Sequence, residues 1–346
     1  MFVAAAAGCT GCGSADEIPR DRLGALPFPG LLTLYSAGDP AHLGPHRYEH
    51  RPRLFGPDES ERGIIYTVRA GFLDLAHVRI AIDWTRYCTR AVHQAIRSRQ
   101  PAVTLPGPEG DTFHVTLNYP DAYAASDADD PGAALDPVAC RIGQRAAYLM
   151  LTWHEIATWF GYRTVFFIDE SPSAFTYDDS VSHLVGMRVA ERAMGDADRG
   201  FDEAVTVALD AELRALGAVG PEQTDQAARA VEGVWWADGR PLKRQADVCP
   251  GEDEVVHPWL VPGLPFAAGD PSPEPFPLPH LDGPPGLYAA VTASIAVEPV
   301  IPEAQAMREL IPGRPNWFRE EHDLTALVSA MRSQMRAQYG PYVNNP

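Results

Sequence analysis

The sequence predicts an α+β protein with a mainly helical core and a few short strands. Several long segments repeat apolar residues at helical spacing, whereas shorter runs are β-branched or alternate between apolar and polar residues. A proline-rich stretch separates the main domain from a C-terminal α/β extension. With 346 residues, of which 45% are hydrophobic and 21% charged, the chain is long enough to bury a sizeable core.

The strong acidic balance limits the classes of partner. The formal net charge is −18, which opposes contact with the phosphates of nucleic acid and with an anionic membrane surface. No run of the sequence approaches the ~18–20 apolar residues that span a bilayer. We therefore expect no nucleic-acid partner, and a membrane contact only through a lipid anchor at the N-terminus.

Residues 1–15 form a small-residue run that contains Ala6-Ala7-Gly8-Cys9 and then turns polar. This tetrad resembles a bacterial lipobox, in which the cysteine is lipidated after cleavage. No Lys or Arg precedes Cys9, and the apolar run is shorter than the core of a signal peptide. Two interpretations stay open, a lipoprotein signal remnant lipidated at Cys9 or an Ala-rich disordered tail. The first predicts a bacterial cell-envelope location.

The first half of the chain predicts an irregular arm over residues 16–62, followed by regular elements. β-branched and helical patterns predict a strand at 63–68, a helix at 74–98 and a hairpin of strands 102–105 and 113–119. Asp74 is placed to cap the first helix. The Gly/Pro-rich turn at 106–111 closes the hairpin.

The second half predicts more helix. Helical patterns and a few strand-like runs predict helices at 137–160, 178–194, 201–216, 221–236, 303–311 and 323–339, a short buried run at 165–168 and a strand at 288–297. Gly161 is placed to end the first of these helices. Eleven prolines between Pro250 and Gly286 exclude a packed helix there. We expect a main domain at 16–245, a Pro-rich strap at 246–286, and an extension at 287–346 packed on the main domain.

The candidate chemistry begins on the helix at 137–160. Metal-dependent hydrolysis on a helix commonly uses two ligands at i and i+4 with a Glu beside the first. His154 and Glu155 supply one ligand and the base, but the i+4 position holds Thr158. A neutral hydroxyl is a poor zinc ligand compared with imidazole or carboxylate. This helix alone therefore does not make a metal site.

The next helix supplies further ligands. Asp179 lies 25 residues after His154 and shares a helix face with His183, at i+4. The run Asp179-Ser-Val-Ser182-His183-Leu-Val-Gly186 resembles the third-ligand helix of thermolysin-like gluzincin metallopeptidases. The resemblance covers residues 151–187. It implies that His154 is the first zinc ligand, Glu155 the general base, Asp179 the acidic ligand and His183 a residue that supports the ligands.

Two departures from that family's pattern require a rebuilt site. Thr158 replaces the second His ligand, and the acidic ligand is Asp instead of the longer Glu. We expect His77, or His183 itself, to complete the ligand set. Behind the ligands we expect Asp74, Ser182, Arg79 and Asp83, with Asp74 placed to orient the ring of His77. Arg79 and Asp83 form either a polar pair of the site or an exposed salt bridge worth under about 1 kcal/mol.

A second resemblance spans most of residues 50–340. The blocks GFLDLAHVRIAID, TWHEIATWFGY and SAFTYDDSVSHLVG, with the later VWW and PWLV, look like an uncharacterised bacterial lipoprotein family, a domain of unknown function. This resemblance implies an envelope location and agrees with the lipobox interpretation. It implies no established activity.

Three functions are consistent with these patterns. The first is a zincin-like hydrolase of the cell envelope that uses Zn²⁺ on an unknown substrate, such as a peptide or cell-wall material. The second is a non-catalytic envelope lipoprotein whose His/Asp/Glu cluster is structural. The third is a glycan hydrolase with Glu155 and Asp179 as its acid/base pair, which requires an open cleft and a carboxylate separation of roughly 5–10 Å.

Overall fold

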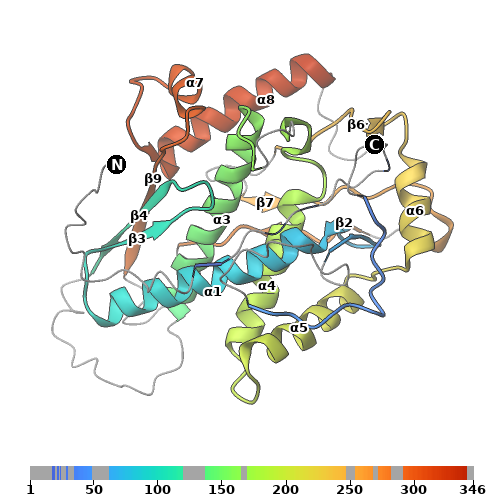
Figure 1. Ribbon diagram of the computed structural model, residues 1–346, viewed down its shortest axis with the longest axis horizontal. Coiled ribbons are helices and arrows are strands. Elements are labelled where there is room, and N and C mark those ends of the chain that lie inside the picture. Colours follow the sequence, from blue (N-terminus) through green and yellow to red (C-terminus); the bar gives the residue numbers. More distant parts are fainter. Residues whose placement is uncertain are drawn as a thin grey trace, which may run out of the picture.

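A computed structural model describes residues 18–19, 22, 24, 29, 35–48, 62–119, 137–164, 170–246, 254–267, 272–281 and 291–340. Within these ranges the protein has the expected α+β fold (Figure 1). Cys9 and the predicted buried run at 165–168 lie outside the described residues. None of the described helices is long and apolar enough to cross a membrane.

Helices form most of the core. Their bounds are α1 Leu75–Arg97, α3 Pro137–Trp159, α4 Asp179–Met194, α5 Phe201–Ala215, α6 Pro221–Ala230, α7 Ala304–Glu309 and α8 Thr325–Tyr339. Short 3-10 turns lie at Ser171–Ser173 and Pro265–Ala267, and a π turn at Glu320–Leu324 leads into α8. Asp74 caps α1 as expected, because its carboxylate accepts a hydrogen bond from the backbone N–H of Ala76.

Two glycines let α1 approach its neighbours closely. A Cβ on Gly143 of α3 would stand 2.5 Å from the Cα of Thr89, and one on Gly186 of α4 would stand 2.3 Å from the carbonyl oxygen of Val78. Both distances are too short for any side chain larger than hydrogen. α1 therefore packs against the backbones of α3 and α4, the two other helices that carry candidate residues (Figure 1).

The strands form small antiparallel sheets. β1 Ile64–Thr67 pairs with β2 Gly71–Asp74, and a four-stranded sheet has the order β10-β9-β4-β3. Its strands are β3 Ala102–Pro106, β4 Thr112–Asn118, β9 Thr292–Glu298 and β10 Phe318–Arg319. Two-residue strands make the pairs β5 Trp236–Ala237 with β6 Arg240–Pro241 and β7 Val255–Val256 with β8 Phe276–Pro277. β9 comes from the C-terminal extension and lies between β10 and β4, so the extension completes the main sheet.

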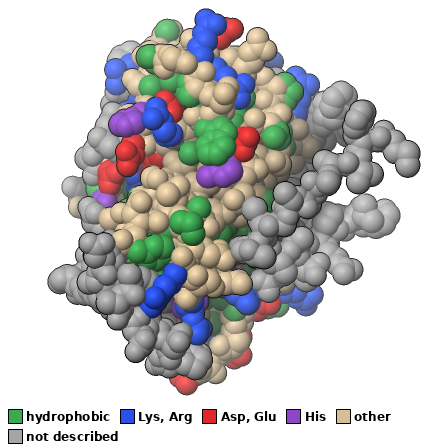
Figure 2. Space-filling view, turned by 90° about the vertical axis from the view of Figure 1, so that its left-hand side faces the viewer, with side chains coloured by type: hydrophobic (Ala, Val, Ile, Leu, Met, Phe, Trp, Pro, Cys, Tyr) green, Lys and Arg blue, Asp and Glu red, His purple; other side chains and the backbone are tan. Residues whose placement is uncertain are grey.

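The inner face of the four-stranded sheet is apolar and its outer face is polar. Val103, Phe113 and Val115 point into the core. On the outer side, the ring of half-exposed Trp317 stacks on His114 with centroids 4.1 Å apart. Figure 2 shows the side of the molecule that lies at the left in Figure 1, where charged side chains of both signs are scattered among separate hydrophobic ones.

Some sequence predictions were incomplete or wrong at the level of elements. β2 was not expected, because its four residues merge with the apolar pattern of α1. The helix predicted at 221–236 ends at Ala230, since Gly233 adopts a left-handed backbone with φ +78° and turns the chain. Trp235 and Trp236 then enter a buried aromatic cluster. The described parts of the Pro-rich strap, 254–267 and 272–281, bury side chains such as Trp259 and Phe276.

Candidate metal centre

The close contact between α1 and α4 brings two histidines together. Gly186 of α4 packs on the carbonyl of Val78, the residue after His77. His183 lies one helical turn before Gly186, so its ring reaches the same part of α1. The ring centroids of His77 and His183 are 5.3 Å apart in an edge-to-face arrangement. α3, which also packs on α1, adds Glu155.

These three residues form a group that could hold a metal ion. One ligand atom each from His77, Glu155 and His183 lie within 4.8 Å of one another. A second such group consists of Asp74, His77 and Asp178. Both groups contain His77, which the sequence analysis proposed as the replacement ligand.

Carboxylates surround the Nδ1 atom of His77. This atom lies 3.2 Å from Oδ1 of Asp179 and 3.4 Å from Oδ2 of Asp74. Burial alone would lower the pKa of His77, but the charges of Asp74, Asp179 and Glu155 outweigh it and raise the pKa well above its usual value. Without a metal, His77 is therefore an imidazolium held by acidic neighbours.

The pKa values of the other two members of the group, His183 and Glu155, are shifted in opposite directions. Burial, together with the positive charges of His77 and His154, lowers the pKa of His183 well below its usual value. Burial and the nearby Asp179 raise the pKa of Glu155 to about 7. Oε2 of Glu155 also accepts a hydrogen bond of 3.0 Å from the backbone N–H of Phe175. A neutral imidazole therefore lies beside a carboxyl group that is fixed in position.

His154 takes a different place from the one that its sequence position implied. Its Nδ1 lies 2.6 Å from Oε1 of Glu109, whose side chain is buried. Burial would lower the pKa of His154, but the hydrogen bond and the charge of Glu109 raise it to about 9. The His154 side chain is 30% exposed. Neither metal-competent group found among the described residues includes it.

Hydrogen bonds from Thr176 hold Asp178 and Asp179 in place at the start of α4. Oδ2 of Asp179 accepts hydrogen bonds from the backbone N–H of Thr176, at 2.7 Å, and from its hydroxyl, at 3.1 Å. The same hydroxyl donates to Oδ1 of Asp178, while the buried Oδ2 of Asp178 has no hydrogen-bond partner among the described residues. Burial and the neighbouring Asp179 raise the pKa of Asp178 well above its usual value. Asp179 thus lies against His77 without being a member of either metal-competent group.

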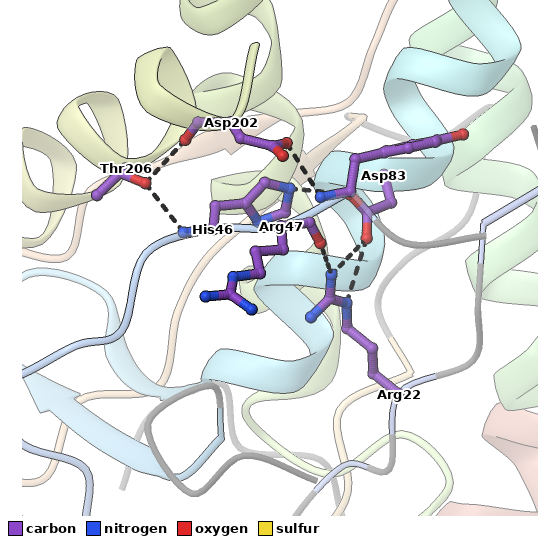
Figure 3. Close-up of polar contacts among 7 residues, drawn as sticks. Arg22, His46, Arg47, Asp83, Asp202 and Thr206 are labelled. Carbon is purple, nitrogen blue, oxygen red and sulfur yellow. Dashed lines mark hydrogen bonds and ion pairs between the residues drawn. The ribbon is translucent and has the colours of Figure 1, made fainter. Parts of the chain in front are cut away.

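The residues expected behind the ligands are all buried. The backbone N–H of Asp74 donates to the hydroxyl of Ser182, at 2.9 Å, which ties the start of α1 to α4. Arg79 donates to the carbonyl of Gly44, at 2.7 Å. Asp83 binds Arg22 and His46 (Figure 3). The alternative of an exposed Arg79–Asp83 salt bridge is wrong, because neither residue is exposed.

The sequence did not predict two residues that contact His154 and His77. Glu109 lies in the Gly/Pro-rich turn of the hairpin, 45 residues from His154, and no local pattern links the two. Gly24 of the N-terminal arm packs on His77, and a Cβ added to it would stand 2.8 Å from Nε2. A glycine in an irregular arm carries no signal of such a contact.

The family described as "Protein of unknown function (DUF4056)" matches residues 7–246. This match covers more than half of the 346-residue chain. The chain belongs to the DUF4056 family. The DUF4056 match includes α1, α3 and α4, and therefore every residue of the candidate centre. A search of curated proteins and a search of solved structures each found no match.

Proposed function

We propose that this DUF4056 protein is a metal-dependent hydrolase of the bacterial cell envelope, with a divalent cation held by His77, His183 and Glu155. The observation that carries the proposal is the convergence of their three ligand atoms within 4.8 Å. Two imidazoles and one carboxylate are a ligand set that catalytic zinc uses. Bound zinc supplies polarisation of a scissile carbonyl and a lowered pKa of bound water.

The surroundings of the three residues fit a cation. Asp74 and Asp179 lie against Nδ1 of His77, an arrangement that orients a ligating imidazole and increases its basicity. His183 is neutral, as a ligand must be. The cluster contains the buried carboxyl group of Glu155, and three more, those of Asp74, Asp178 and Asp179, lie around it. A cation would offset their mutual repulsion.

This assignment changes two roles that the gluzincin resemblance implied. Glu155 holds the ion instead of acting as the base, and His154 is not a ligand. His154 is partly exposed and is held at Nδ1 by the buried Glu109. We propose that His154 acts on the substrate. Its other ring nitrogen, Nε2, would form a hydrogen bond with the reacting group or exchange a proton with it.

The location and substrate class rest on the sequence. The lipobox-like Ala6–Cys9 and the resemblance of the longer chain to a bacterial lipoprotein family support an envelope location with lipidation at Cys9. Peptides and cell-wall material are the polymers found there, and they contain the amide bonds that zinc hydrolases cleave. We therefore propose an amide-containing substrate of the envelope.

A second candidate function is favoured by burial. Glu155 is 5% and Asp179 2% exposed, and Gly24 covers one side of His77. A cluster this enclosed also suits a non-catalytic envelope protein in which a bound ion or the hydrogen-bonded cluster itself holds α1, α3 and α4 together. The same burial counts against the glycan hydrolase, which needs both carboxylates in an open cleft.

Hydrolysis assays separate the first two candidates. The purified protein, loaded with Zn²⁺, would be incubated with a mixture of quenched fluorescent peptides and with purified peptidoglycan. The hydrolase proposal expects cleavage that a chelator abolishes and that Glu155→Gln removes. Glu191→Gln, a change of the same type on the solvent side of α4, should retain it. Zinc bound without any cleavage of either probe would contradict the hydrolase and favour the non-catalytic candidate.

A further inference from the structure

A separate buried polar cluster is built around Asp83 of α1. The guanidinium of Arg22 donates to Oδ2 of Asp83 from Nη2, at 2.7 Å, and from Nε, at 3.2 Å (Figure 3). Nε2 of His46 lies 3.0 Å from the other carboxylate oxygen. The side chain of Arg22 is 4% exposed and that of Asp83 0%. Arg22 therefore fills a closed pocket.

The walls of this pocket are held without Arg22. The backbone N–H of His46 donates to the hydroxyl of Thr206 on α5, at 2.9 Å (Figure 3). The backbone N–H of Tyr48 donates to Asp202, at 3.0 Å. The carbonyl of Arg47, between them, accepts a 2.9 Å hydrogen bond from Nη2 of Arg22. A carboxylate, which His46 holds at its other oxygen, and a backbone carbonyl thus converge on one planar cation, the geometry that suits a guanidinium.

Arg22 lies two residues before Gly24, the arm residue that touches the candidate metal centre. A Cβ at position 24 would stand 2.8 Å from Nε2 of His77 and 2.9 Å from Oδ2 of Asp74. Nε2 is the ring nitrogen of His77 on the side away from its carboxylate partners, which lie against Nδ1. Gly24 thus occupies space from which a ligand or substrate would approach Nε2.

We propose that Asp83, held in place by His46, and the carbonyl of Arg47 form a guanidinium-binding pocket that holds the chain's own Arg22 and thereby keeps Gly24 against His77. The contact is autoinhibitory, because it closes one side of the metal centre. This inference rests on the proposed function only because it calls that centre a metal site. The covering of His77 by Gly24 is tested without any metal.

The experiment measures access to His77 in metal-free, full-length protein. Diethyl pyrocarbonate reacts with the unprotonated fraction of each accessible imidazole. That fraction is small at both His77 and His154, so peptide mass mapping compares the modification rate at each histidine between variants at one pH. His154, already partly exposed, is the internal reference. Arg22→Gln removes the cation but leaves His46 on Asp83, so the carboxylate of α1 keeps a partner. Arg199→Gln, in an exposed pair with Asp196, is the matched control.

Arg22→Gln should raise the ratio of His77 to His154 modification at least about tenfold, which corresponds to about 1.4 kcal/mol of closing free energy. Arg22→Lys should raise it less, because the ammonium keeps the charge but loses the two-point contact. Arg199→Gln should leave it unchanged. A ratio in Arg22→Gln equal to that of the wild type would overturn the proposal, and so would equal rises at both histidines. If the protein binds no metal, the metal-site proposal fails, but this ratio still shows whether Arg22 keeps Gly24 against His77.

Discussion

At the scale of single residues, the buried carboxylates of Asp74, which caps α1, and of Asp83, within α1, are neutralised in different ways. Asp74 caps the helix and faces the imidazole of His77. Asp83 is paired with Arg22 and His46 inside the protein. Because a buried charge is costly unless it is paired, each carboxylate makes stability depend on its partner. Asp83 gives the clearer test, since its partners belong to the N-terminal arm.

Asp83→Asn should destabilise the protein at neutral pH and much less in acid. Burial would raise the pKa of Asp83, but His46 and Arg22 outweigh it and lower the pKa below its usual value. A carboxyl with a depressed folded-state pKa contributes stability above its unfolded pKa of about 3.9, and the contribution is lost as pH falls through the folded value. Because the change leaves Arg22 buried without its counter-charge, we expect a loss of about 3–5 kcal/mol at pH 7.

Urea unfolding of the wild type and the variant between pH 7 and pH 3 measures this difference. Asp210→Asn, which breaks an exposed pair with Arg214 on α5, is the control and should cost under about 0.5 kcal/mol. The difference in unfolding free energy between wild type and Asp83→Asn should shrink towards low pH. If it does not, the carboxylate is not what stabilises the arm.

At the scale of elements, the centre depends on how closely α4 lies against α1. Gly186 meets the carbonyl oxygen of Val78 and the Cβ of Ala81, at 2.3 and 2.7 Å from the position of an added Cβ. A backbone carbonyl in a helix cannot move aside as a flexible side chain can. The spacing between His77 and His183 is therefore set by a residue that carries no chemistry itself.

Gly186→Ala should force the two helices apart. We expect a loss of about 1–3 kcal/mol, the usual cost of overpacking a core, together with weaker metal binding because His183 moves away from His77. Thermal and urea unfolding measure the first effect and metal titration the second. Gly195→Ala, at the end of the same helix, is the control, because its added Cβ meets nothing closer than 3.5 Å. Equal stability of the two variants would contradict this account.

At the scale of the whole molecule, the sequence predicted most of the helical core and part of the centre. Helical periodicity located α1, α3 and α4, and the i, i+4 spacing placed Asp179 and His183 on one face. His77 was recognised as a candidate because Asp74 precedes it by one turn. In each case the information lies within a few turns of one helix, where 3.6-residue spacing fixes relative position.

What the sequence did not predict depends on contacts between distant segments. Glu109 meets His154 because the β3–β4 hairpin packs on α3, and Gly24 meets His77 where the N-terminal arm, with Arg22 on Asp83, returns to α1. The helix at 221–236 was extended too far because Trp235 and Trp236 look like a helical face but fill an aromatic cluster. β9 was expected as a strand, but its place between β4 and β10 has no local signal.

The measurement that tests the central claim most directly is a titration of zinc into the metal-free protein by calorimetry, with the bound metal counted by elemental analysis. We expect one Zn²⁺ per wild-type chain. His183→Ala should weaken binding by at least about 100-fold, since loss of even a residue behind a ligand costs about 10–100-fold. His154→Ala should keep the stoichiometry, because His154 pairs with Glu109, and so should His257→Ala, a change at an exposed histidine. A wild type that binds no zinc, or a His183→Ala variant that binds it as tightly as the wild type, would contradict the metal centre.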